Sequence, residues 1–73
     1  PTIEERMALA LRHAELLASY EGKSIVRMRK HAMWYVGGLK EASALRRDIT
    51  TAVTLDDFRS IFEHALRLNE EHQ

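Results

Sequence analysis

Apolar residues recur at helical spacing along almost the whole chain, and this feature most restricts the folds open to it. A spacing of three and four residues places side chains on one face of a helix, whereas strands need alternation, which appears nowhere convincingly. The clearest stripes lie near the two ends: Ile3, Met7, Ala10, Leu11, Ala14, Leu17 and Ala18, and then Leu55, Phe58, Ile61, Phe62, Ala65 and Leu68. The pattern predicts an all-α fold.

Glycines and caps divide these stripes into four helices. Gly22 suits the end of a first helix, and Gly37-Gly38 suits the end of a second one, since glycine turns easily. Thr2 with Glu5 and Thr54 with Asp57 have the spacing of capping boxes at the start of the first and last helices. Ser24 is a plausible cap for the second helix, and a short third helix is expected over 41–49.

The same spacing predicts the core. The second helix turns one side inward, and so does the segment after it: Ile25, Met28, Ala32 and Val36, then Leu39, Ala42, Leu45 and Ile49. Leu9, Leu16 and Tyr20 extend the first stripe, so the first helix is expected to be covered on more than one side. Residues 1–73 then form a single small bundle of four helices.

Composition narrows the function classes. Without cysteine, neither a disulfide nor a thiolate zinc site is available, and His13, His31, His64 and His72 never pair at metal-binding spacing. No local motif joins residues into a catalytic group, so we expect no catalytic and no metal-binding residue. No apolar run approaches the roughly 20 residues of a membrane span, and no secretory signal is present. We therefore expect a cytoplasmic domain, cut from a longer protein because the chain starts at Pro1.

A net charge of zero conceals strong segregation. Residues 23–47 hold seven cations and one acid, a net charge of +6, while residues 1–22 and 48–73 carry −2 and −4. A basic centre of this kind suits a polyanionic partner. The alternative is that the acidic flanks simply neutralise the centre in the folded domain.

The basic segment also carries the only tryptophan. At 100° per residue Arg27, Lys30 and Trp34 fall together, with His31 close by, opposite the apolar stripe. Cations bind phosphates, and an exposed tryptophan stacks on unpaired bases, so this face predicts RNA binding. Arg46 and Arg47 extend the face if the turn at residues 37–38 folds the third helix back. Alternatively, Trp34 covers a seam between helices.

The run Arg27-Met28-Arg29-Lys30-His31, with Trp34-Tyr35 and Gly38-Leu39 after it, resembles a segment of bacterial tRNA-dihydrouridine synthases. Residues 13–17 and 20–22 before it, and residues 44–47, Ile49 and 54–58 after it, are similar in order and spacing. In that family the segment is a C-terminal helical domain that follows a flavin-binding barrel.

The resemblance implies that this domain holds tRNA while the barrel, with FMN and NADPH, reduces a uridine. Arg27, Lys30 and Trp34 would face tRNA or dock the barrel, whereas Arg29 could instead bridge to an acid on another helix. Neither the catalytic cysteine nor the flavin contacts of that family are present in this chain. The cofactors would therefore belong to the parent enzyme.

Two other functions remain open. The basic-aromatic face could dock on an acidic partner domain, which in the parent could be the barrel. A helix-turn-helix DNA binder around Gly37-Gly38 is weaker, because the cations precede the turn whereas a recognition helix normally follows it.

Overall fold

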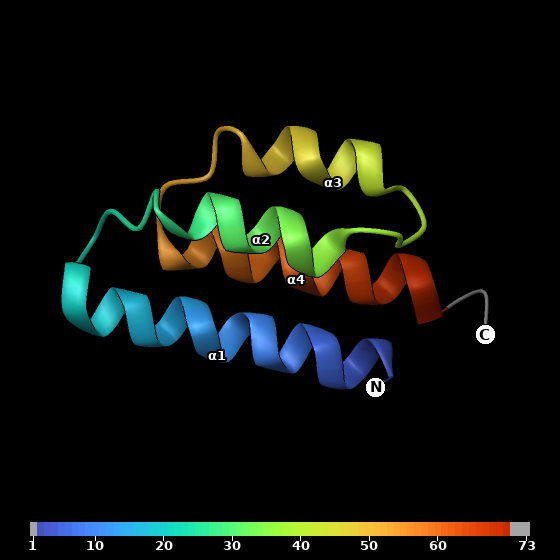
Figure 1. Cartoon of the computed structure of the whole chain (residues 1–73), viewed down its shortest axis with the longest axis horizontal. Helices are drawn as coiled ribbons and strands as arrows, with labels where there is room; N and C mark the ends of the chain where they lie inside the picture. The colour runs from blue at the N-terminus through green and yellow to red at the C-terminus, as the bar shows by residue number, and fades with distance from the viewer. Residues whose placement is uncertain (1, 71–73) are drawn as a thin grey trace.

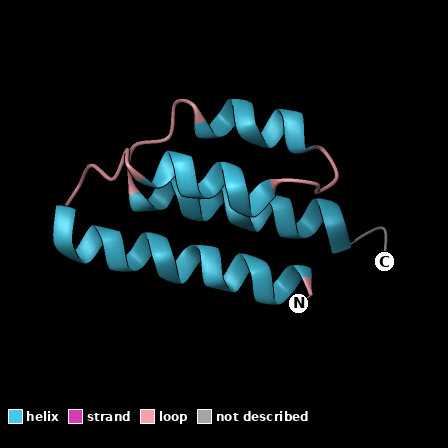
Figure 2. Ribbon diagram, in the orientation of Figure 1, coloured by secondary structure: helices cyan, strands magenta, loops and turns pink. Residues whose placement is uncertain are grey.

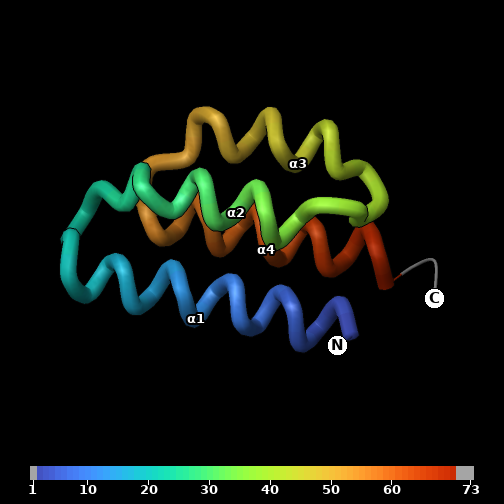
Figure 3. The backbone as a smooth tube through the Cα atoms, in the orientation of Figure 1, coloured from blue at the N-terminus to red at the C-terminus, as the bar shows by residue number. Residues whose placement is uncertain are grey.

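The chain folds into four helices, as the apolar spacing predicts. The computed structural model describes residues 2–70, within which there is no strand (Figures 1 and 2). The helices are α1 (Ile3–Glu21), α2 (Met28–Val36), α3 (Ala42–Ile49) and α4 (Leu55–Glu70). Successive connections lie at alternate ends of the molecule, so consecutive helices run in opposite directions (Figure 3). The sequence also predicts that residues 70–73 fray: Glu70 is the last residue of α4, and 71–73 lie outside the described residues.

The helices pack in a ring of contacts. α1 packs against α4 and α2, and α3 packs against α2 and α4 on the other side (Figure 1). The core between them contains the stripes expected from the sequence, together with one alanine from the connector before α4. Its buried side chains are Met7, Ala10, Ala14, Ile25, Met28, Ala32, Val36, Leu45, Ile49, Ala52, Phe58, Ile61, Phe62 and Ala65.

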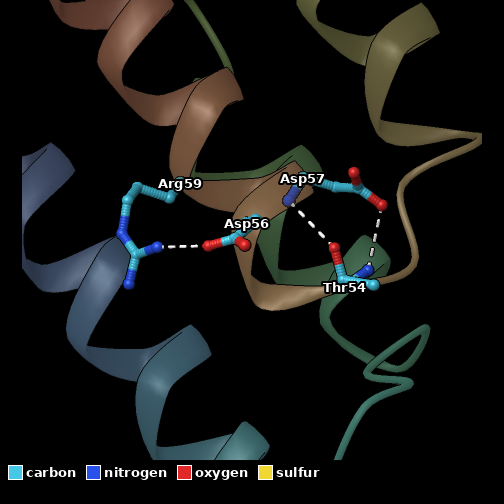
Figure 4. Close-up of polar contacts among 4 residues, drawn as sticks. All are labelled: Thr54, Asp56, Asp57 and Arg59. Carbon is cyan, nitrogen blue, oxygen red and sulfur yellow. Dashed lines mark hydrogen bonds and ion pairs between the residues drawn. The ribbon is translucent and has the colours of Figure 1, made fainter.

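Both predicted capping boxes are present. The Thr2 hydroxyl accepts a hydrogen bond from the Glu5 amide, and the Glu5 carboxylate accepts one from the Thr2 amide. Thr54 and Asp57 make the same reciprocal pair at the start of α4 (Figure 4). In α1 and α4, therefore, an amide of the first turn is satisfied by the side chain of the threonine that precedes the helix.

The prediction that Ser24 caps the second helix is wrong. α2 begins at Met28, and its N-cap Arg27 makes no side-chain capping bond. The amide of Ile25 instead donates to the carbonyl oxygen of Val53 at 2.7 Å. This bond and the complete burial of Ile25 hold the segment before α2 against the connector before α4. The start of α2 is therefore determined by the long-range contact between Ile25 and Val53, and not by the capping preference of Ser24.

The third helix starts one residue later than expected. Glu41 is its N-cap and adopts a left-handed conformation with φ of 63°, so the helix comprises Ala42–Ile49. Gly38 has φ of 79°, which glycine adopts without strain. The reversal between α2 and α3 thus uses one glycine and one non-glycine residue with positive φ.

The expectation that α1 is covered on more than one side is also wrong. Leu9, Leu16 and Tyr20 are 55%, 57% and 81% exposed. α1 contacts its neighbours through the stripe that contains Met7, Ala10 and Ala14, and both neighbours lie on that side. No described helix covers the second apolar strip of α1, which consists of Leu9, Leu16 and Tyr20.

Candidate nucleic-acid interface

The outward face of α2 presents an uncovered tryptophan. Trp34 is 78% exposed, whereas Met28, Ala32 and Val36 on the opposite face of the helix are fully buried. The alternative that Trp34 covers a seam between helices is therefore wrong. Its ring meets the half-buried ring of Tyr35 edge to face, with centroids 5.4 Å apart. This contact leaves the indole available for stacking.

An open groove of ≈ 850 Å³ runs beside this tryptophan, between α2 and α1. It brings together four of the six residues predicted to bind RNA, and no carboxylate lines it. Its lining residues are His13, Val26, Arg27, Arg29, Lys30, His31, Trp34 and Tyr35. A cationic groove with an aromatic wall suits a chain of phosphates that carries flat bases.

The two cations predicted to face RNA differ in their surroundings. Arg27 donates to the carboxylate of Glu21 at 2.9 Å, and its own side chain is 79% exposed. The guanidinium end of this pair is thus open to solvent and to a phosphate, whereas the Glu21 side chain is only 21% exposed. Lys30 is exposed and makes no ion pair with any residue in the described range 2–70. Of these two cations, Lys30 is therefore the more available to a ligand.

Two arginines fix α2 in place. The Nε of Arg29 donates to the carbonyl oxygen of Ala52 at 2.7 Å. Arg29 is half-buried, and its partner is this backbone carbonyl and not the acid suggested by the sequence. At the other end of α2, Arg6 donates to the carbonyl oxygens of Gly37 at 3.2 Å and Tyr35 at 3.5 Å. A cation at a helix C-terminus also opposes the negative end of the helix dipole.

A histidine pair forms part of the groove. The rings of His13 on α1 and His31 on α2 lie 4.4 Å apart between centroids, and His13 also meets Tyr35 edge to face at 6.1 Å. Burial, and then the neighbouring His31, lower the pKa of His13 below its ordinary value of 6.5. His31 is exposed, as a ligand-facing residue must be.

The sequence did not indicate His13 as a site residue. It stands one position before the buried Ala14, at the edge of the stripe that α1 turns toward its neighbours. That position was the only local signal, because the proximity of His31 depends on how α1 and α2 pack.

Arg46 and Arg47 lie apart from the groove. α3 does fold back against α2, but neither arginine is among the residues that line the groove. Both are exposed in the last turn of α3, where positive charge favourably opposes the helix dipole. Their part in RNA binding stays a prediction.

The acidic pairs of the sequence have structural roles. Glu4, Glu5, Asp56 and Asp57 lie in the first turns of α1 and α4, and Asp56 pairs with Arg59 (Figure 4). Residues 2–70 contain no group of three or more metal-ligating acids, histidines or cysteines. Every helix in that range is too short or too polar to cross a bilayer.

Comparison with known proteins identifies relatives of this segment. The chain is 35% identical over 65 residues to a probable tRNA-dihydrouridine synthase of Mycobacterium tuberculosis, and 36% identical over 59 residues to one of Mycobacterium leprae. It is 27% identical over 67 residues to probable tRNA-dihydrouridine synthase 1 of Synechocystis.

These matches cover 86%, 78% and 90% of this chain but 17%, 15% and 19% of the respective relatives. The chain thus spans about a sixth of the length of the curated relatives it matches. No family model matches the chain. No solved structure matches it either.

Proposed function

Because the chain is similar over most of its length to one segment of tRNA-dihydrouridine synthases, we propose that it is the tRNA-binding helical domain of such an enzyme. In this proposal residues 1–73 form one domain of a longer cytoplasmic flavoenzyme. The domain makes no bonds itself. It holds tRNA so that a uridine meets the catalytic part in a reactive geometry, which lowers the entropic cost of the reaction.

The exposed Trp34 at the edge of a carboxylate-free cationic groove carries this proposal. Burying an indole usually stabilises a small domain, yet here the ring stays in solvent beside Arg27 and Lys30. Lys30 and Arg27 would hold consecutive phosphates, and Trp34 would stack on an unpaired base or a ribose.

FMN and NADPH belong, in this proposal, to the part of the enzyme that this chain does not span. The described glycines end α1 and α2, and none stands in a strand-to-helix loop that could cradle a cofactor phosphate. The residues of the groove suit phosphate and base recognition but include no group that identifies a flavin site. We assign no step of the reduction to this chain.

Titration with unmodified tRNA at several salt concentrations tests the proposal. Wild-type affinity should fall steeply with salt, and Lys30→Ala should weaken binding and reduce the slope of log K against log salt by about 1. Trp34→Ala should cost about 1–3 kcal/mol of binding free energy through lost stacking, with little change in the slope. Arg67→Ala is the matched control, because Arg67 is exposed on α4 and outside the groove.

The outcomes separate the alternatives. Equal loss of tRNA affinity in Lys30→Ala and Arg67→Ala would mean that charge alone, and not this groove, attracts RNA. Tighter binding of a length-matched DNA duplex than of tRNA would favour the helix-turn-helix reading instead. Circular dichroism melting of each variant verifies that the fold is intact.

A second candidate function is docking on an acidic partner domain, which could be the flavin-binding barrel. The exposed apolar strip of α1 favours it: Leu9 and Leu16 line a hollow that adjoins the groove through His13 and Tyr35. Loss of docking in Trp34→Ala with unchanged RNA affinity would support this candidate over the first.

A further inference from the structure

The histidine pair is the feature of the groove that phosphate binding by arginine and lysine leaves unexplained. His13 and His31 come from different helices, and their ring centroids are 4.4 Å apart. Two rings at this distance repel each other once both are protonated. The pair is therefore suited either to staying uncharged or to sharing an anion.

The charges around the pair favour the second of these alternatives, in which the two histidines share an anion. On α1 the neighbours of His13 along the adjoining hollow are Arg12 and Glu15. The cations come from α2 and the residue before it: Arg27, Arg29 and Lys30. Arg27 pairs with Glu21 and Arg29 donates to a backbone carbonyl, whereas Lys30 makes no ion pair within residues 2–70. The residues that line the groove itself therefore include cations and no carboxylate.

We propose that the His13–His31 pair binds a phosphate of the RNA backbone and takes up a proton as it does so. This inference rests on the proposed function, because the phosphate is that of the RNA held by Lys30 and Trp34. The shared chemistry is a tetrahedral oxyanion, which accepts hydrogen bonds from one N–H donor of each ring, and one of these rings is the imidazolium that has taken up the proton. His13 thereby becomes a binding residue.

The direction of the pH effect follows from linkage. In the free protein, burial and the neighbouring His31 lower the pKa of His13 below 6.5. A phosphate beside the ring favours its charged form, so the pKa in the complex is higher than in the free protein. Affinity is greatest below the free pKa, falls as pH rises through the pKa of the complex, and levels off above it.

Calorimetric titration of the chain with unmodified tRNA between pH 5.5 and 8.5 at constant ionic strength tests the inference. Two buffers with different ionisation enthalpies report the protons taken up. We expect wild-type affinity to rise about three- to tenfold from pH 8 to pH 6, since one linked proton gives at most tenfold per pH unit. His13→Gln and His31→Gln should each reduce the proton uptake and flatten this profile.

His64→Gln is the matched control, since His64 is exposed on α4 and does not line the groove. It should keep the wild-type pH profile. Trp34→Ala should weaken binding at every pH while it preserves the proton uptake. A profile that is the same in His13→Gln and in the wild type overturns the inference.

Sulfate, which keeps its charge across this range, separates failure of the inference from failure of the proposed function. In NMR titrations without RNA, sulfate should raise the pKa of His13 in the wild type and leave the ring signals of His64 unaffected. Sulfate binding without tRNA binding would overturn the proposed function but leave the phosphate site standing. Binding of tRNA without proton uptake, together with no response to sulfate, would overturn the phosphate site alone.

Discussion

At the scale of single residues, Glu41 bears the clearest local strain. It is the one non-glycine residue in the described chain with positive φ, at 63°, and it is exposed. A left-handed conformation costs an L-residue with a Cβ roughly 1–2 kcal/mol, whereas glycine adopts it freely. The tight reversal that brings α3 against α2 imposes this cost.

Glu41→Gly should therefore leave the free energy of unfolding unchanged or raise it by up to about 1 kcal/mol, because strain relief outweighs the added freedom of the unfolded chain. Urea denaturation measures this. The matched control Glu63→Gly, at an exposed position inside α4, should lose about 1 kcal/mol. A similar loss at both positions would contradict the assignment of strain to Glu41.

At the scale of helices, the ends of α1 and α4 depend on acids within their capping boxes. Asp57 accepts hydrogen bonds from the amides of Thr54 and Val53, at 3.0 and 2.9 Å, and these bonds lower its pKa below 3.8. Glu5 is similarly affected, because its bond from the amide of Thr2 lowers its pKa below 4.5. Both carboxylates thus favour the folded state only while they are ionised.

Acidification should consequently weaken the fold. Since both pKa values are lower in the folded state, this stabilisation is fully present above about pH 5 and is lost as pH falls through the folded values. Thermal melts between pH 2 and 7 should show a smaller acid-induced drop in Tm for Asp57→Asn than for the wild type. Asp48→Asn, an exposed acid outside both boxes, is the control and should follow the wild-type curve.

Much of the fold could be predicted at this scale because helical periodicity and caps are local. The inward positions of α2 and both capping boxes were correct, since a few neighbouring residues determine each of them. The start of α2 was predicted wrongly, because the Ile25–Val53 hydrogen bond joins segments that are 28 positions apart in the sequence.

The candidate site divides in the same way. Trp34, Lys30 and Arg27 share one helix and were found from spacing, whereas His13 joins them only through the packing of α1 on α2. The apolar pattern of Leu9 and Leu16 indicates a partner surface without telling whether the partner lies in the same chain.

At the scale of the whole molecule, two apolar surfaces of α1 have different roles. One faces the core through Met7, Ala10 and Ala14, while Leu9 and Leu16 stay in solvent. The exposed strip adjoins the groove, so anything that docks on it would lie beside a bound RNA.

Replacing both exposed leucines, Leu9→Gln with Leu16→Gln, should change the free energy of unfolding by no more than about 0.5 kcal/mol per site. Leu45→Ala, at a fully buried position, should cost about 2–5 kcal/mol. Chemical denaturation at two protein concentrations gives both values. A large loss in the double variant that depends on concentration would show that the strip is covered by self-association.

The first turn of α2 and the segment before it are held by acceptors that belong to the main chain. The carbonyl oxygens of Ala52 and Val53 receive the Arg29 side chain and the Ile25 amide, and neither bond uses the side chain of the accepting residue. Val53 is partly exposed, so its side chain can be exchanged during sequence divergence without removing the acceptor. The backbone path of the connector, and not the side chain at position 53, thus determines how α2 is oriented. A substitution of Val53 is therefore expected to leave that orientation unchanged.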